Sequence, residues 1–379
     1  MTAPDTTRPS RDLRPVSDYL RGFAMVLVLL SHYREHFLGG DPLWEGYGNA
    51  AVALFLVLSG YGNGLSLRAA GAWSWRGVLD FYLRRFTRIY PLYYVGLLSI
   101  ALCSGAWPDW RALLGLEAPF WFVHAIIQCY LAAPILLAAL ARLGPGRFVL
   151  AATAGLALVN LAGYALYPDL PGWARGNVLV FRHLFLGHVY LFAMGLALPS
   201  LALPASILAF PFRASASGSS PADSGASLTG GVGAADAVPG GAAPAGSGRG
   251  GAGPTARALG VLGLYLAFTL ANGVTTASQA LNLLNGCVFA AASVWVCAAM
   301  LNLGHVPPPG WALRAVGRAS YPIYILEAAF HYVLLLSGPL DGARGVLRYL
   351  LFFPLFWLAC RALDLGLSRL AALALPRRG

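Results

Sequence analysis

The chain has 379 residues, of which 58% are hydrophobic and only 11% are charged, and its mean hydropathy is +0.65. About a quarter of the residues in a soluble domain are charged, so this composition excludes an ordinary soluble protein and predicts an all-α polytopic membrane protein. The 26 basic residues behind the net charge of +11 are all arginine; in a membrane protein they indicate orientation and anionic lipid headgroups rather than nucleic acid.

Apolar segments that are long enough to cross the bilayer, or nearly so, predict ten transmembrane helices. They fall at about residues 20–37, 50–67, 90–105, 120–140, 147–166, 183–201, 258–274, 279–301, 319–337 and 345–362. With the N-terminus in the cytoplasm, twenty of the 26 arginines fall on the cytoplasmic side and six outside. This asymmetry favours ten spans with both termini inside. The first residues lack the apolar core and small-residue cleavage site of a signal peptide, so none is expected.

The first predicted helix carries a histidine in its apolar interior. Its polar start holds Asp18 and Arg21, and an apolar run leads from there to His32. At about 1.5 Å rise per residue, His32 lies roughly 16 Å beyond Arg21, about halfway across the hydrocarbon core. An ionisable side chain at that depth indicates a functional site. As a functional group, His32 would be a general base that takes the proton of an acceptor hydroxyl, with Tyr33 beside it as a candidate substrate contact. The alternative is that His32 only packs between helices.

A metal site at the same place is a weaker alternative. His32, Glu35 and His36 match the H-x-x-E-H pattern of one zinc-peptidase class, and the two histidines share a helix face. The third ligand would have to be Glu45, Glu117, Glu327 or an aspartate, with no supporting motif. We therefore expect no metal. The five cysteines lie in apolar segments without paired metal spacing, so buried free thiols are expected.

Residues 76–91 predict a basic interfacial helix between the second and third spans. Arg84, Arg85 and Arg88 are spaced to share one helix face, and Pro91 is expected to break the helix before the next span. The arginines alone suit an anchor on anionic lipid. They also suit a clamp for phosphate oxygens, such as those of cytoplasmic coenzyme A.

Polar side chains in three other helices are candidate substrate contacts. Ser59 belongs to a stretch of small and polar residues in the second helix, and Trp121 opens a polar stripe in the fourth. Tyr324 and Glu327 follow three-residue spacing in the ninth helix and share a face, and an intramembrane glutamate usually faces a cavity or a partner.

A segment of glycine, alanine, serine and proline divides the chain into two membrane parts. Residues 213–257 bury no apolar face and predict a disordered cytoplasmic linker. The expected organisation is a first membrane half of six helices (residues 1–212), this linker, and a second half of four helices (residues 258–379).

Several blocks resemble the integral-membrane acyltransferase type 3 family, which includes bacterial enzymes that acylate surface glycans and some secondary metabolites. The opening DYLRG followed by His32 is similar to the family's D-x-L-R-G…H helix, and RRFTRIYP resembles its RRxxRIxP block. The further similar blocks are LFLVLSGY at residues 54–61, the W-F…Y…P pattern at residues 121–134 and SYPIY at residues 320–324. The chain departs from the family where many members have a glutamate pair, here Ile126 and Ile127, and where many have a histidine, here Glu327.

The resemblance implies roles for the matching residues. His32 corresponds to the essential first-helix histidine, and Arg85 and Arg88 to the cytoplasmic pair near acyl-CoA. Asp18 and Arg21 match the opening motif and are predicted, with His32, as catalytic-site residues, their ion pair fixing the helix end. The implied activity is O-acyl transfer, with acetyl the expected group, from acyl-CoA as co-substrate to a sugar, a glycan or a small molecule, without a bound cofactor. The implied location is the bacterial cytoplasmic membrane. A transporter with His32 and Glu327 as a proton relay is the main alternative, and an assembly subunit without chemistry is another.

Overall fold

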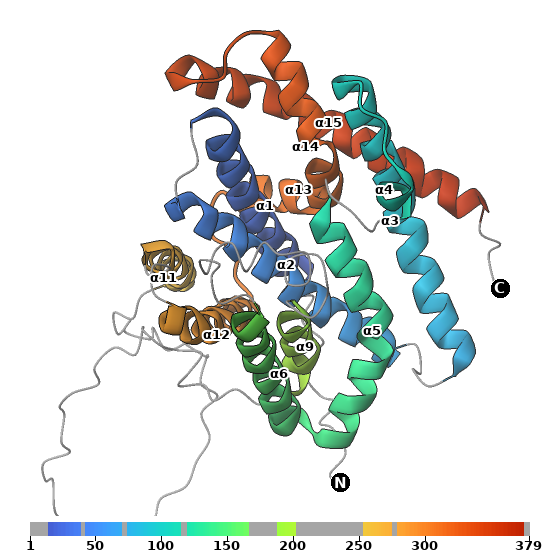
Figure 1. Cartoon of the computed structure of the whole chain (residues 1–379), viewed down its shortest axis with the longest axis vertical. Coiled ribbons are helices and arrows are strands. Elements are labelled where there is room, and N and C mark those ends of the chain that lie inside the picture. The colour runs from blue at the N-terminus through green and yellow to red at the C-terminus, as the bar shows by residue number, and fades with distance from the viewer. Residues whose placement is uncertain are drawn as a thin grey trace, which may run out of the picture.

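The computed structural model describes residues 14–38, 42–69, 74–114, 120–166, 188–201, 253–274 and 279–374. Within these ranges the chain forms twelve α-helices, one short 3₁₀ helix and no strand (Figure 1). The all-α class is therefore confirmed. The helices are α1 (Arg14–Phe37), α2 (Pro42–Ala69), α3 (Trp75–Ser104), α4 (Trp110–Leu114), α5 (Trp121–Leu143), α6 (Pro145–Leu166), α9 (Val189–Ala197), η2 (Leu198–Ser200), α11 (Pro254–Val274), α12 (Gln279–Leu303), α13 (Gly310–Arg318), α14 (Ser320–Leu336) and α15 (Gly342–Ala374).

Several helices are long and apolar enough to cross a membrane. Among the described residues there are four: Tyr47–Arg68, Trp75–Ser104, Trp121–Leu143 and Gly342–Leu370. A fifth arises if α13 and α14, bent by 78° at their junction, are counted as one span. Helix α1 is not among them because charged side chains near both of its ends lower its hydropathy. The protein is an integral membrane protein with several apolar helices, and the full set of ten spans stays a prediction.

The predicted break at Pro91 is wrong. Residues on both sides of this proline belong to one continuous helix, α3, with Pro91 inside it. A proline costs a helix one hydrogen bond, but Phe81 before it and Leu92 and Tyr93 after it are all buried. Tertiary packing on both sides of Pro91 therefore keeps the helix continuous, and Arg84, Arg85 and Arg88 lie within a candidate span rather than on a separate surface helix.

Helix α2 is the centre of the molecule. It contacts α1, α3, α5, α9, α11 and α12, and Figure 1 shows it crossing the middle of the bundle. Its residues Ala50, Leu54 and Leu58 are completely buried. Because α11 and α12 come from the predicted second half, the two halves pack against each other. Most of the predicted linker lies outside the described residues.

Glycines set the closest helix contact near the charged end of α1. A β-carbon added at Gly22 would lie 1.8 Å from the carbonyl oxygen of Leu313, and one at Gly317 would lie 1.8 Å from that of Asp18. Only glycine permits such an approach. The glycine pair therefore brings the C-terminal end of α13 against the polar start of α1.

The prediction that all cysteines are buried is wrong for one of them. Cys129, Cys297 and Cys360 are buried, but Cys103 is exposed near the end of α3. The side chain of Cys287 lies outside the described residues. Apolar neighbours in the sequence cannot distinguish a residue that faces lipid from one that faces the protein interior.

Candidate active site

A cavity of about 390 Å³ lies among helices α1, α2, α3, α5, α13, α14 and α15. Its charged lining residues are Asp18, Arg21, Arg85, Arg88, Arg318, Arg361 and Asp364. Five arginines against two aspartates leave an excess of positive charge. Such a lining favours an anionic ligand.

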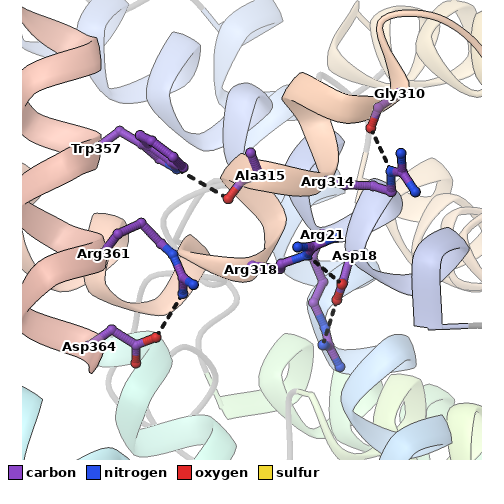
Figure 2. A network of polar contacts seen from close by, with 9 residues as sticks. All are labelled: Asp18, Arg21, Gly310, Arg314, Ala315, Arg318, Trp357, Arg361 and Asp364. Carbon is purple, nitrogen blue, oxygen red and sulfur yellow. Dashed lines mark hydrogen bonds and ion pairs between the residues drawn. The ribbon is translucent and has the colours of Figure 1, made fainter. Parts of the chain in front are cut away.

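Asp18 connects two helices at the charged end. Its carboxylate accepts a hydrogen bond of 3.3 Å from Nε of Arg318 on α13, and its other oxygen lies 3.8 Å from Nη1 of Arg21 (Figure 2). The ion pair expected between Asp18 and Arg21 is therefore present. The contact to Arg318 was not predicted, since it joins residues 300 positions apart.

Of Arg84, Arg85 and Arg88 on α3, only two line the cavity. Arg85 and Arg88 line the cavity, but Arg84 is exposed and is not part of the lining. The guanidinium of Arg85 stacks over Phe81 and Tyr130, with its carbon 5.5 and 5.8 Å from the two ring centres, a cation–π arrangement that orients it. Of the three arginines predicted to share one helix face, the cavity is thus lined by Arg85 and Arg88.

The opposite end of the cavity is apolar. Along each of three helices, the residues that line the cavity change from polar or charged to apolar. The lining runs from Asp18 and Arg21 to Val28 on α1, from Asn63 and Ser59 to Phe55 and Val52 on α2, and from Tyr130 to Ile126, Val123 and Phe122 on α5. The cavity therefore offers a cationic end and an apolar end to the same ligand.

His32 and Glu327 form a pair one helical turn beyond the apolar end. Val28 precedes His32 by four residues and Tyr324 precedes Glu327 by three, and both of these preceding residues line the cavity. Nδ1 of His32 lies 2.9 Å from Oε2 of Glu327. The Glu327 side chain is 3% exposed and that of His32 is 34% exposed, so the carboxylate is buried while the imidazole is still accessible.

A second histidine faces the other oxygen of Glu327. Nε2 of His331 lies 3.8 Å from Oε1 of Glu327, and both atoms are buried without a hydrogen-bond partner. The rings of His36 and His331 lie 5.8 Å apart, and those of His32 and His36 lie 6.2 Å apart. Despite this gathering of histidines, no group of three side chains in the described ranges has the geometry to hold a metal ion.

The other predicted contacts divide into two groups. Ser59 and Tyr324 line the cavity. Tyr33 is buried and its hydroxyl donates to the carbonyl of Leu340, at 2.5 Å, and the Trp121 ring lies 5.5 Å from that of His188. Neither Tyr33 nor Trp121 belongs to the lining of the cavity.

Comparison with known proteins decides the family. The model of the acyltransferase 3 family, described as an acyltransferase domain, matches residues 15–363. The chain belongs to the acyltransferase 3 family. It is also similar to "Protein 2 in picA locus" of Rhizobium radiobacter, with 31% identity over 172 residues that cover 43% of this chain and 75% of that protein. No solved structure matches the chain.

Membership of the acyltransferase 3 family confirms the resemblance read from the sequence blocks. It shows that the protein is a membrane acyltransferase, and so favours the enzyme over the transporter and the assembly subunit.

Proposed function

We propose that this acyltransferase moves an acyl group from cytoplasmic acyl-CoA to a hydroxyl of a sugar, a glycan or a secreted small molecule. Acetyl is the expected group, and the bacterial cytoplasmic membrane is the expected location. One observation carries the proposal: an arginine-lined cavity becomes apolar along its length and ends one helical turn from the His32–Glu327 pair.

The charged end of the cavity suits the nucleotide part of acyl-CoA. Guanidinium groups bind phosphate oxygens through paired hydrogen bonds. Arg88 lines the cavity and makes no ion pair or hydrogen bond within the described parts of the chain, so its donors are available to a ligand. The apolar end then receives the less polar arm that carries the thioester.

His32 is the proposed general base. Its Nδ1 lies 2.9 Å from the carboxylate of Glu327, an arrangement in which Nδ1 carries the proton and Nε2 is the basic nitrogen of the ring. Nε2 takes the proton of the acceptor hydroxyl as the oxygen attacks the thioester carbonyl. The C–O bond forms, the C–S bond breaks, and His32 returns the proton to the sulfur of coenzyme A. The carboxylate stabilises the imidazolium between these steps, as the acid of a catalytic triad does.

Turnover of radiolabelled acetyl-CoA by the purified protein in nanodiscs tests these assignments. His32→Ala should abolish thioester loss, including slow hydrolysis without an acceptor, because the base is gone. Arg88→Ala should raise KM with a smaller effect on kcat, because it removes a contact to the donor. Arg84→Ala is the matched control: this side chain is exposed and does not line the cavity, so its KM should stay near that of the wild type.

The opposite results have clear meanings. Full turnover by folded His32→Ala would remove the base role. Equal KM changes in Arg84→Ala and Arg88→Ala would indicate that the arginines act through their general charge and not through the cavity. No binding or turnover of acyl-CoA by folded wild-type protein, across added acceptors, would reject coenzyme A as the carrier.

A further inference from the structure

The five arginines of the cavity form two groups from different parts of the chain. Arg21, Arg85 and Arg88 come from α1 and α3, and Arg21 interacts electrostatically with both of the others. Arg318 and Arg361 come from α13 and α15. The second group was not predicted as a binding site from the sequence, and the match to the family says nothing about what it binds.

A hydrogen bond joins α15 to α13, and a glycine contact joins α13 to α1. Trp357 of α15 donates a hydrogen bond of 3.1 Å to the carbonyl of Ala315 on α13 (Figure 2). Arg361 lies one turn after Trp357, Arg318 lies one turn after Ala315, and both side chains line the cavity. The glycine contact described above holds α13 against α1 in turn.

Each arginine of the second group is oriented by an aspartate and keeps donors for a ligand. Nε of Arg318 donates to Asp18, and Nη1 of Arg361 donates to Asp364 at 3.1 Å. A guanidinium has five N–H donors, and neither side chain makes a further hydrogen bond within the described residues. Side chains held in this way lose little freedom when a phosphate binds.

Arg85 and Arg361 differ in their place along the cavity. Arg85 stacks on Tyr130, which lies one turn from Ile126 at the apolar end. Helix α15, in contrast, contributes only Arg361 and Asp364 to the lining, so it meets the cavity at its charged end alone. Arg85 therefore lies nearer the apolar end that leads toward His32, and Arg361 lies at the charged end, away from it.

We propose that Arg318 and Arg361 form a second phosphate site, which binds the 3′-phosphate on the ribose of acyl-CoA while Arg85 and Arg88 bind its diphosphate. The assignment rests on the proposed use of acyl-CoA.

The diphosphate is joined directly to the arm with the thioester, so it is expected to bind the arginines nearest the apolar end that leads toward His32. The 3′-phosphate branches from the ribose, away from that arm, and is expected to bind the second group.

Acetyl-CoA and 3′-dephospho-acetyl-CoA differ only in this phosphate, so the ratio of their kcat/KM values measures the second site. The ratio is taken on one protein preparation and does not depend on the folded fraction. We expect the wild type in nanodiscs to prefer acetyl-CoA by about tenfold or more, since hydrogen bonds between charged groups are the strong ones. Arg361→Gln should reduce this preference severalfold through KM, with kcat for acetyl-CoA little changed.

Three further variants separate the second site from general charge. Arg361→Gln with Asp364→Asn keeps the local net charge and should lose the preference as the single variant does. Arg88→Gln should weaken both donors by a similar factor and keep the ratio. Arg314→Gln is the control, because Arg314 donates to Gly310 of its own helix at 3.1 Å and does not line the cavity (Figure 2); its ratio should equal that of the wild type.

The results that overturn the second site differ from those that overturn acyl-CoA as donor. Three results would each reject Arg361 as the 3′-phosphate ligand. The wild type could use both donors equally, Arg361→Gln could keep the wild-type ratio of kcat/KM values, or the charge-neutral double variant could restore that ratio. If Arg88→Gln, and not Arg361→Gln, loses the preference for acetyl-CoA over the dephospho form, the assignment of the 3′-phosphate and the diphosphate to the two arginine groups is wrong. No turnover of either donor would reject the proposed function, and the second site with it.

Discussion

At the scale of single residues, the contact between His32 and Glu327 is the most consequential feature of the site. A neutral glutamine at position 327 would keep the shape of the side chain and a hydrogen bond to Nδ1, but it would lose the negative charge. The proposed mechanism needs that charge when His32 holds the proton.

Glu327→Gln should therefore lower kcat by about a hundredfold or more, within the range of general-base effects. KM for acetyl-CoA should stay similar, because no cavity arginine is changed. Protonated His32 would also lose its stabilising partner, so the activity that remains should persist to lower pH than in the wild type. The profile of kcat against pH checks this.

The control for this variant is Glu35→Gln, since Glu35 lies on α1 near His32 but is exposed. An unchanged kcat in Glu327→Gln, or an equal loss in Glu35→Gln, would mean that the pair of His32 and Glu327 is structural. A shift of activity toward higher pH in Glu327→Gln would contradict the stabilisation of the imidazolium.

The sequence indicated both members of this pair but not their contact. His32 was found from its depth in an apolar helix, and Glu327 from its shared face with Tyr324. The two residues are 295 positions apart, and the sequence does not indicate which helix packs against the one that carries Glu327. Intramembrane charge thus marks residues that need partners, while the choice of partner depends on helix packing, which periodicity does not reveal.

At the scale of elements, the contact between α1 and α13 positions both the ion pair of Asp18 and the second arginine group. Helix α13 was not predicted, because its nine residues mix apolar and charged side chains and are too short to span. Helix α14 agrees closely with the predicted ninth span, and α3 shows that a proline signal can be overridden by burial on both sides of it.

Gly317→Ala should destabilise this contact. The new methyl group would lie 1.8 Å from the carbonyl oxygen of Asp18, so α13 would have to move away from α1. Overpacking of this kind costs about 1–3 kcal/mol, and it should lower the thermal midpoint in detergent and raise KM for acetyl-CoA through Arg318.

Gly263→Ala in α11 is the matched control, because an added β-carbon there meets nothing within 4 Å. Alanine favours a helix over glycine by up to about 1 kcal/mol, so this variant should be neutral or slightly stabilising. If both variants have the same thermal midpoint, the approach of the two helices is less close than the structure has it.

At the scale of the whole molecule, the cavity gathers arginines that the topology prediction had placed on one side of the membrane. Arg21, Arg85, Arg88, Arg318 and Arg361 all belong to the predicted cytoplasmic set, and all five line the cavity. Arginine asymmetry could therefore indicate which helix ends lie together. It could not show which arginines face the cavity, as Arg84 and Arg88 illustrate, because that depends on how each helix is rotated against its neighbours.

The orientation of the molecule can be tested with a cysteine that the protein already has. Cys103 is exposed at the end of α3 opposite to Arg85, and 18 residues of helix separate the two by about 27 Å, close to the thickness of the hydrocarbon core. With the arginines inside, a membrane-impermeant maleimide should label the protein in right-side-out vesicles, and Cys103→Ser should remove that label.

Ser74→Cys in the Cys103→Ser background provides the opposite probe, because Ser74 is exposed at the arginine end of α3. It should be labelled only after the vesicles are permeabilised. The reverse pattern would place the arginine cavity on the outer side of the membrane, where cytoplasmic acyl-CoA cannot reach it. The excess positive charge of the cavity would then need a different anionic ligand, and the donor proposed here would be wrong even if His32 and Glu327 carry out the transfer.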